Sequence, residues 1–196
     1  MPIRLFCLAL LAALAAAAQN PAQLEALQRL KSLDLETNPA LRAAVLRVVA
    51  ETRGTPQYVE LVRDFGLADQ AEGLLEAAVR LAGQSAGAEA ARLLLAQGET
   101  NRLEGELRTG HPHEAAPLAQ SLGETGDRAA VPLLLAALGR DDDHVIRTAA
   151  IRGLAGTQEG ARELLRLARE GRLDERGRHA AALALAQARW PEIKAA

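Results

Sequence analysis

The stretch GDRAAVPLLLAALGRDDDHVIRTAAIRGLAG, residues 126–156, decides the fold because the chain repeats its pattern. A shift of 31 residues places it on TQEGARELLRLAREGRLDERGRHAAALALAQ, residues 157–187. The shift aligns Leu133-Leu134 with Leu164-Leu165, Arg147 with Arg178, Ala149-Ala150 with Ala180-Ala181, and Leu154 with Leu185. A period near thirty that contains two helices predicts an all-α fold, an α-solenoid of stacked antiparallel helix pairs.

Helix signals also recur through the rest of the chain, and no stretch alternates apolar and polar residues as a half-buried strand would. NPALRAAVLRVVAETRG, residues 38–54, begins with an asparagine suited to the N-cap and a proline suited to the first helical position, and it closes with glycine. TPQYVELVRDFG, residues 55–66, repeats this order, and further helices are expected over 68–83 and 87–98. The short connections favour antiparallel neighbours. We expect about five helix pairs stacked into a short right-handed solenoid.

Residues 1–18 have the composition of a signal peptide. Arg4 precedes an uninterrupted apolar run of 14 residues, 5–18, which is shorter than the ~20 residues of a membrane-spanning helix. Ala16 and Ala18 supply the small residues that signal peptidase reads, so cleavage is expected after Ala18. We predict a periplasmic or secreted protein with no stable membrane span after cleavage.

The mature chain would keep 22 basic and 25 acidic residues, a formal net charge of −3, and no cysteine. It would therefore have no disulfide, no thiolate metal ligand and no CxxCH haem attachment. Its aromatic residues are Tyr58, Phe65 and Trp190, and its arginines are interleaved with acidic residues. A nucleic-acid partner is not expected, because the sequence lacks a basic patch and a set of stacking residues.

The acidic run DDDH, residues 141–144, raises the question of a metal or acid/base site. Consecutive residues that enter a helix point in different directions, whereas metal ligands converge. One aspartate is expected to cap a helix over 142–155, with Arg147 one turn further along. The run is echoed by Asp174-Glu175 after the 31-residue shift. This recurrence favours a repeated helix start over a catalytic cluster.

A second candidate metal site is HPHE, residues 111–114. His111 and His113 could bind a metal together with a third residue, such as His144 or His179. The proline between the first two is expected to start a helix, which would turn their side chains about 200° apart around the helix axis. Exposed histidines at a helix start are therefore the favoured interpretation.

The sequence contains no motif for nucleophilic or nucleotide chemistry. Ser32, Ser85 and Ser121 are its serines, and none lies in a G-x-S-x-G turn. The glycines form neither GxGxxG nor GxxxxGK[ST]. We predict no catalytic residue, no bound metal and no cofactor, and hence a protein that is not an enzyme.

The stretch 126–156 resembles a HEAT repeat. The turn, the first helix, the inter-helix turn and the start of the second helix of that family match residues 126–127, 131–134, 141–143 and 146–150. The resemblance is good over 116–156, fair over 157–188 and only architectural over 21–115. It implies an armadillo-type superhelix.

The resemblance also implies a domain organisation and a function. Residues 19–115 would be irregular repeats, and 116–196 would be HEAT-like repeats of the same continuous solenoid domain. In HEAT-like stacks, aspartate and arginine bond between repeats, which suggests this structural role for Asp143 and Arg147. The implied function is protein–protein binding or scaffolding, with these candidate partner-binding residues: Arg147, Arg152, Arg178 and Trp190. A lid over the last repeat is the favoured alternative for Trp190.

A narrower resemblance covers most of the mature chain. Residues 41–98, with ARELLRLAREGRL and the closing RWPEIKAA, are similar to the helical-repeat segment of large exported bacterial proteins. In those proteins the segment links a propeller-type dehydrogenase region to a C-terminal c-type haem domain. The resemblance implies an accessory subunit or a fragment of a periplasmic redox assembly, with a cytochrome or dehydrogenase as partner. This chain departs from that pattern because it has neither the propeller nor a CxxCH.

A third hypothesis is a HEAT-like lyase or glycosylase that holds a chromophore or a base in its concave groove. Such a pocket is lined by aromatic or nucleophilic residues. Three aromatic residues in the mature chain disfavour this hypothesis.

Overall fold

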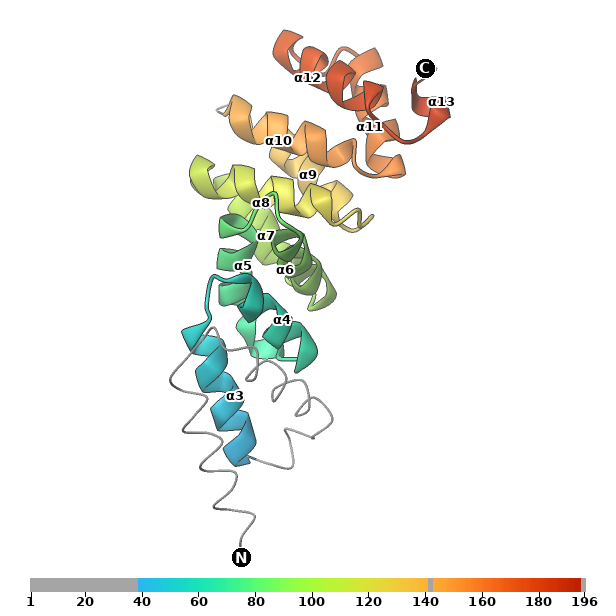
Figure 1. Ribbon diagram of the computed structural model, residues 1–196. Coiled ribbons are helices and arrows are strands. Elements are labelled where there is room, and N and C mark those ends of the chain that lie inside the picture. Colours follow the sequence, from blue (N-terminus) through green and yellow to red (C-terminus); the bar gives the residue numbers. More distant parts are fainter. Residues whose placement is uncertain (1–38, 141–142, 195–196) are drawn as a thin grey trace, which may run out of the picture. The chain divides into compact units, whose positions relative to one another are not determined.

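The computed structural model describes residues 39–140 and 143–194, which form helices and connecting turns and contain no strand (Figure 1). The contacts divide the chain into two units, Met1–Asp69 and Gln70–Ala196, and each is described by itself. The predicted all-α fold class is confirmed.

Three of the expected features lie outside the described residues: the signal peptide at 1–18, the N-cap at Asn38, and the acidic residues Asp141 and Asp142. Within the ranges that the structure describes, no helix is long and apolar enough to cross a membrane.

The first unit contains α3, Pro39–Glu51, and α4, Pro56–Asp64. The turn between them is as predicted, because Gly54 has a φ of 77°, a left-handed conformation that glycine adopts at little steric cost. Thr55 caps α4 through its side-chain oxygen, which accepts a hydrogen bond from the Tyr58 N–H at 3.3 Å. The two helices are in contact, and their buried apolar residues include Val45, Val49, Tyr58, Val59 and Val62.

The second unit is a succession of helices joined by short turns. After a 3-10 turn at Ala68–Gln70, its helices are α5 (Ala71–Arg80), α6 (Ser85–Ala96), α7 (Thr100–Thr109), α8 (Pro112–Glu124), α9 (Ala130–Leu138), α10 (His144–Leu154), α11 (Gln158–Arg169), α12 (Glu175–Ala186) and α13 (Pro191–Lys194). Two of these correspond to the expected helices over 68–83 and 87–98, although α6 starts two residues before the expected one.

Helices α5, α8, α10 and α12 lie side by side in that order, each in contact with the next (Figure 1). One helix, α9, joins α8 to α10, and one, α11, joins α10 to α12. Two helices, α6 and α7, come between α5 and α8. The stack is therefore regular from α7 onward and carries an additional helix before it, in the region where the sequence repeat is weak.

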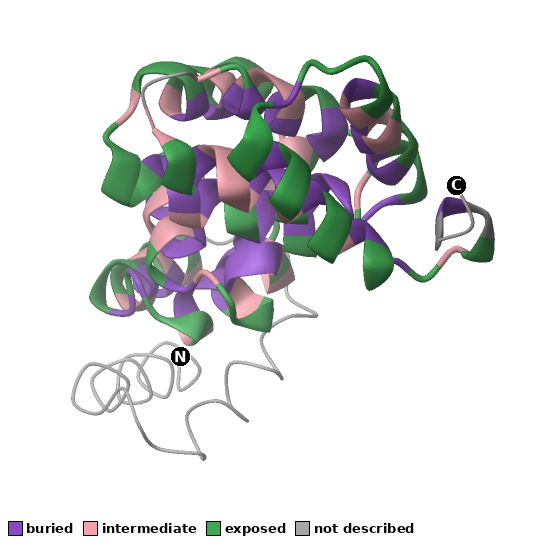
Figure 2. Ribbon diagram, turned by 90° about the horizontal axis from the view of Figure 1, so that it is seen from above, coloured by how far each residue is buried: buried purple, intermediate pink, exposed green. Residues whose placement is uncertain are grey.

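The 31-residue shift relates two buried positions of α10 to two buried positions of α12. Ala150 and Ala181 are both buried, and so are Leu154 and Leu185. The sides of the helices that face their neighbours are buried, and the outward sides are exposed (Figure 2). Burial of small and medium-sized apolar side chains thus provides the core, as expected for a chain with few aromatic residues.

Candidate functional site

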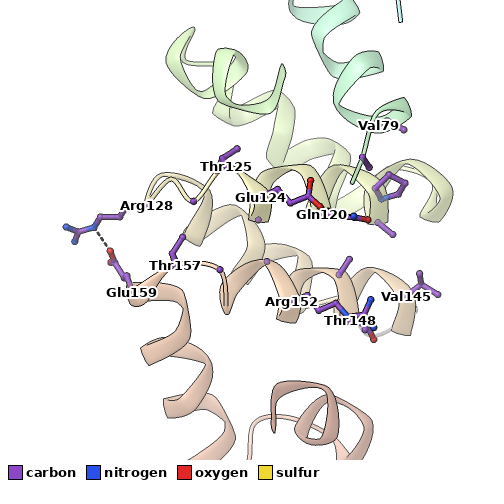
Figure 3. A pocket seen from close by; sticks show the side chains of 18 of the residues that line it. Val79, Gln120, Glu124, Thr125, Arg128, Val145, Thr148, Arg152, Thr157 and Glu159 are labelled. Atoms are coloured by element: carbon purple, nitrogen blue, oxygen red, sulfur yellow. Dashed lines mark hydrogen bonds and ion pairs between the residues drawn. The ribbon is translucent and has the colours of Figure 1, made fainter. Parts of the chain in front are cut away.

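A groove with a volume of about 1860 Å³ follows the face of the second unit that α8 and α10 form together (Figure 3). Gln120 and Glu124 lie on the α8 side, and Thr148 and Arg152 lie on the α10 side. Each pair is spaced by four residues, and a helix places such residues on one face. Val79 of α5 and Trp190, which follows α12, also line the groove. Consecutive repeats therefore build one continuous surface.

The floor of the groove is made of small residues at the point where α8 and α10 approach most closely. A Cβ atom on Gly123 would collide with the Cα atom of Gly153. A Cβ atom on Gly153 would lie 3.1 Å from the Cα atom of Gly123 and 3.1 Å from the methyl carbons of Leu134. Both glycines are needed for space rather than for an unusual φ, because neither has a positive φ. The two helix backbones are therefore in contact at these buried glycines, which close the bottom of the groove.

Several polar side chains around the groove are already engaged. The Gln120 amide donates a hydrogen bond to a Glu124 carboxylate oxygen at 2.9 Å. Arg128, before α9, forms an ion pair with Glu159 in the first turn of α11, and this pair links two repeats (Figure 3). The Thr148 hydroxyl donates to the backbone oxygen of His144 at 2.7 Å. These contacts hold the walls in place and reduce the number of free groups.

The charge of the groove is opposite to that of the chain. Its charged residues other than histidine are Arg128, Arg152, Arg162, Arg189, Glu124 and Glu159, which sum to +2. The whole chain has a formal net charge of −2. Arg152 and Arg189 are exposed, and neither has a carboxylate partner in the part of the chain that the structure describes. Two free guanidinium groups therefore face a groove of positive net charge.

The four candidate partner-binding residues fall into two groups. Arg152 and Trp190 line the groove, whereas Arg147 and Arg178 do not. The Arg147 side chain is 17% exposed and is paired within the stack. Arg178 is exposed and donates from Nη1 to the backbone oxygen of Leu173 at 3.4 Å. The groove thus brings two of the four together.

Asp143 and Asp174 occupy equivalent positions at the starts of α10 and α12. Asp143 is the N-cap of α10, and one of its carboxylate oxygens accepts from the Val145 N–H at 2.7 Å and from the Ile146 N–H at 3.3 Å. Asp174 is the N-cap of α12 and accepts from the Gly177 N–H at 2.7 Å. The acidic run at 141–144 therefore contributes a helix cap that recurs with the repeat.

Arg147 connects the two repeats through the second of these caps. Its Nη1 lies 3.1 Å from Oδ2 of Asp174, while Oδ1 of the same carboxylate serves the cap. The hydrogen bond from the Gly177 N–H and, after it, the charge of Arg147 lower the pKa of the Asp174 carboxyl. Arg147, which was expected to bond between repeats, does so, and its acceptor is the cap of the following repeat. The same expectation for Asp143 is wrong among the described residues, because its carboxylate bonds to the first turn of its own helix.

Two further arginines that the sequence did not single out also join successive repeats. Nη1 of Arg140, which follows α9, donates to the backbone oxygen of Gly110 at 2.8 Å, at the end of α7. Nη2 of Arg92, on α6, donates to the backbone oxygen of Thr125 at 3.3 Å, at the end of α8. Both contacts satisfy carbonyl groups at helix C-termini, where a positive charge also interacts favourably with the helix dipole. Their spacing of 30 and 33 residues is the available sequence signal.

The expected divergence of the two histidines in HPHE is wrong. The rings of His111 and His113 are stacked, with centroids 5.4 Å apart and planes inclined by 24°. His111 is the N-cap of α8, with an extended backbone at φ −64° and ψ 142°. Helical rotation does not apply to it, so its ring can lie against that of His113. Pro112 starts the helix, as predicted.

The remaining candidate chemistry does not converge at the groove. Among the described residues, no group of three or more His, Cys, Asp and Glu is arranged to hold a metal ion. Ser121 is fully buried, and its hydroxyl donates to the backbone oxygen of Ala78 at 2.6 Å, which ties α8 to α5. The groove instead offers hydrogen-bonding groups and positive charge over a floor of small residues.

Sequence reasoning missed most of the groove. Four residues that line the groove were not predicted from the sequence: Gln120, Glu124, Thr148 and Arg189. The available signal was the spacing of polar residues by four along α8 and α10. Which side of each helix faces the groove depends on how the repeats stack, which that spacing alone does not specify.

Residues 100–186 match the family model for HEAT repeats. The matched segment begins with α7 and ends with α12, so it contains the helix pairs α7/α8, α9/α10 and α11/α12. No curated protein and no solved structure matches the chain. The match, together with the helical stack, confirms the predicted α-solenoid. The matched segment also carries most of the groove.

Proposed function

Taking the HEAT repeats at residues 100–186 as the premise, we propose that the protein is an exported scaffold that binds a protein partner in the groove over α8 and α10. It has no catalysis of its own in this proposal. Stacked repeats present neighbouring helix faces as one extended surface, which is how solenoids accommodate partners. The observation that carries the proposal is the groove itself, with Arg152 and Arg189 unengaged among the described residues.

The size of the groove favours a polypeptide over a small molecule. Small-molecule sites are enclosed pockets of about 300–1,000 Å³, lined mainly by apolar and aromatic side chains. This groove has a volume of about 1860 Å³ and a single aromatic residue, Trp190. A surface of this kind suits a chain segment that lies along it.

Export is part of the proposal and rests on the N-terminal sequence. Arg4, the apolar run at 5–18 and the small residues at its end have the order of a cleavable signal peptide. A mature chain without cysteine has no free thiol to be oxidised outside the cytoplasm.

The narrower sequence resemblance supports one class of partner, a periplasmic dehydrogenase or c-type cytochrome. The chain would then act as an accessory subunit that docks such a protein, or as a fragment of a larger assembly. Co-purification of a haem protein from the periplasm, detected by its absorbance, would support this partner class. Recovery of a different protein would be consistent with the scaffold proposal but would reject a redox protein as the partner.

The experiment that tests the groove is capture of the partner by the full chain and by a groove-filling variant. Ala149 lines the groove, so Ala149→Trp places a large side chain in the path of a bound segment. Ala96, on α6, is exposed and does not line the groove, so Ala96→Trp is the matched control. We expect the first variant to lose the partner and the control to retain it. Equal capture by both variants would reject the groove as the binding site.

A further inference from the structure

We propose that the groove takes an acidic, extended polypeptide segment, whose carboxylates pair with Arg152 and Arg189 while its main chain lies over the floor at Gly123 and Gly153. This inference rests on the proposed function, because it specifies the chemistry of the partner at the same groove. It is carried by the charge of the lining, the two free guanidinium groups and the shape of the floor.

The first step concerns charge. The charged side chains of the lining, histidines aside, sum to +2, within a chain whose formal net charge is −2. Positive charge is thus concentrated on one surface of an acidic protein. Complementary charge steers partners to such a surface and rejects those of like charge. An acidic segment fits this groove, and a basic one does not.

The second step concerns which groups are available. Arg128 is paired with Glu159, so its charge is already balanced within the protein. Arg152 and Arg189 have no carboxylate partner among the residues that the structure describes. A guanidinium group binds a carboxylate through two parallel hydrogen bonds, which makes arginine the residue best suited to this acceptor. These two arginines are therefore the binding groups.

The third step concerns the shape of the floor. Gly123 and Gly153 bring the backbones of α8 and α10 into contact, and Ala116 and Ala149 continue the lining on either side. Such a lining offers no large apolar or aromatic side chain along these two helices to hold an apolar anchor, and small side chains leave space for a polypeptide to lie along the groove. The Gln120 amide donates one hydrogen bond to Glu124, and its remaining donor and acceptor capacity can serve peptide groups. An extended segment of small and acidic residues matches these features.

The groove discriminates against nucleic acid, the other common polyanion. Glu124 lies among the lining residues, and its carboxylate would repel a regular row of phosphates. Trp190 is the single aromatic residue of the lining, whereas single-stranded nucleic acid is bound on several stacking side chains. A polypeptide can place a neutral residue opposite Glu124, and a phosphate backbone cannot.

The test is binding of defined probes to the full chain, followed by fluorescence anisotropy. The probes are a labelled peptide of alternating glutamate and alanine, the corresponding lysine peptide, and a labelled single-stranded DNA of similar charge. We expect the glutamate peptide to bind, its affinity to fall as salt rises, and the lysine peptide not to bind. Equal binding of both peptides, or tighter binding of the DNA, would overturn the inference.

Matched charge reversals locate the binding. Arg152→Glu and, separately, Arg189→Glu are expected to weaken binding of the glutamate peptide by about tenfold or more, the scale for loss of a charge-assisted hydrogen bond. Arg47→Glu makes the same charge change at an exposed position of α3 that does not line the groove, and it is expected to leave the affinity within about twofold, because it removes no group that pairs with the segment and salt screens exposed charges that are not in contact. Circular dichroism of each variant checks the fold, and Arg152→Gln replaces Arg152→Glu if the latter is unfolded. Equal losses in the groove and control variants would contradict the inference.

Failure of this inference is distinguishable from failure of the proposed function. Suppose that a partner is captured by the wild type, is lost by Ala149→Trp and is not displaced by the glutamate peptide. This result would support the proposed binding of a protein in the groove and would reject the inference that the bound segment is acidic. A partner retained by Ala149→Trp would reject the groove itself.

Discussion

Arg147 on α10 lies 3.1 Å from the carboxylate of Asp174, the residue that caps α12 in the next repeat. One carboxylate thus serves two functions: it completes the start of its own helix and it accepts the ion pair that joins two repeats. A helix cap that recurs with the sequence repeat is therefore also a packing contact between two repeats.

We predict that Arg147 and Asp174 are energetically coupled. Arg147→Gln and Asp174→Asn should each lower the free energy of unfolding, and the double variant should lose less than the sum, because both changes remove the same contact. Asparagine also caps helix N-termini well, so Asp174→Asn mainly removes the negative charge. Denaturant unfolding of the four proteins measures the coupling. Additive effects would show that the contact contributes nothing to stability.

The same pair predicts a pH dependence. The pKa of Asp174 is lowered in the folded protein, chiefly by the hydrogen bond from the Gly177 N–H and then by Arg147. Its contribution to stability is therefore present above the unfolded pKa of about 3.9 and is lost as the pH falls through the folded pKa. The difference in unfolding free energy between wild type and Asp174→Asn should be constant near neutral pH and shrink in acid. A difference that grows toward acid would contradict the assignment.

Gly123→Ala should destabilise the protein by about 1–3 kcal/mol, the usual cost of overpacking. The added methyl group would meet the Gly153 backbone and force α8 and α10 apart. Gly105→Ala, on α7, is the matched control, because a Cβ atom there meets nothing within 4 Å. That change should stabilise the helix by about 0.5–1 kcal/mol. Thermal unfolding of both variants checks the prediction. The unfolding temperature should fall for Gly123→Ala and rise for Gly105→Ala.

Ser121→Ala should cost about 1–3 kcal/mol, because it leaves the buried oxygen of Ala78 without the hydroxyl that donates to it at 2.6 Å. Ser85→Ala, at an exposed position in the first turn of α6, should have an effect within about 0.5 kcal/mol. Denaturant midpoints of the two variants measure the difference. Equal effects would show that the hydrogen bond between α8 and α5 contributes little.

Export predicts a defined mature N-terminus. If the chain is expressed in a bacterium with a periplasm, we expect the mature form to begin at Gln19, after cleavage behind Ala18. N-terminal sequencing of the periplasmic fraction checks this. Recovery of the chain in the cytoplasm with its first residues intact would contradict the export proposal.

The regular part of the fold was predictable from local sequence patterns. Asp143 and Asp174 are separated by the repeat length, and each caps a helix in the structure. Ala150 and Ala181 are separated by the same length and are both buried. Capping and burial depend on residues within a few positions of each other, so a shift of the sequence against itself reveals them.

The groove was predictable only in part, because it depends on how helices far apart in sequence are stacked. Arg147 and Arg178 align by the repeat, but only Arg147 has the cap of a following repeat within reach among the described residues. Arg152 was named as a contact residue, whereas Thr148, one turn earlier on the same face, was not. The close approach at Gly123 and Gly153 requires the backbone positions of two helices, which no local pattern contains.

The most direct test of the groove as the binding surface is site-specific photo-crosslinking to the captured partner. A photoreactive residue replaces Thr148 in the groove in one variant and exposed Arg102 on α7 in the other. We predict that the partner becomes covalently attached at position 148 and not at position 102. Attachment at position 102 alone would contradict the account.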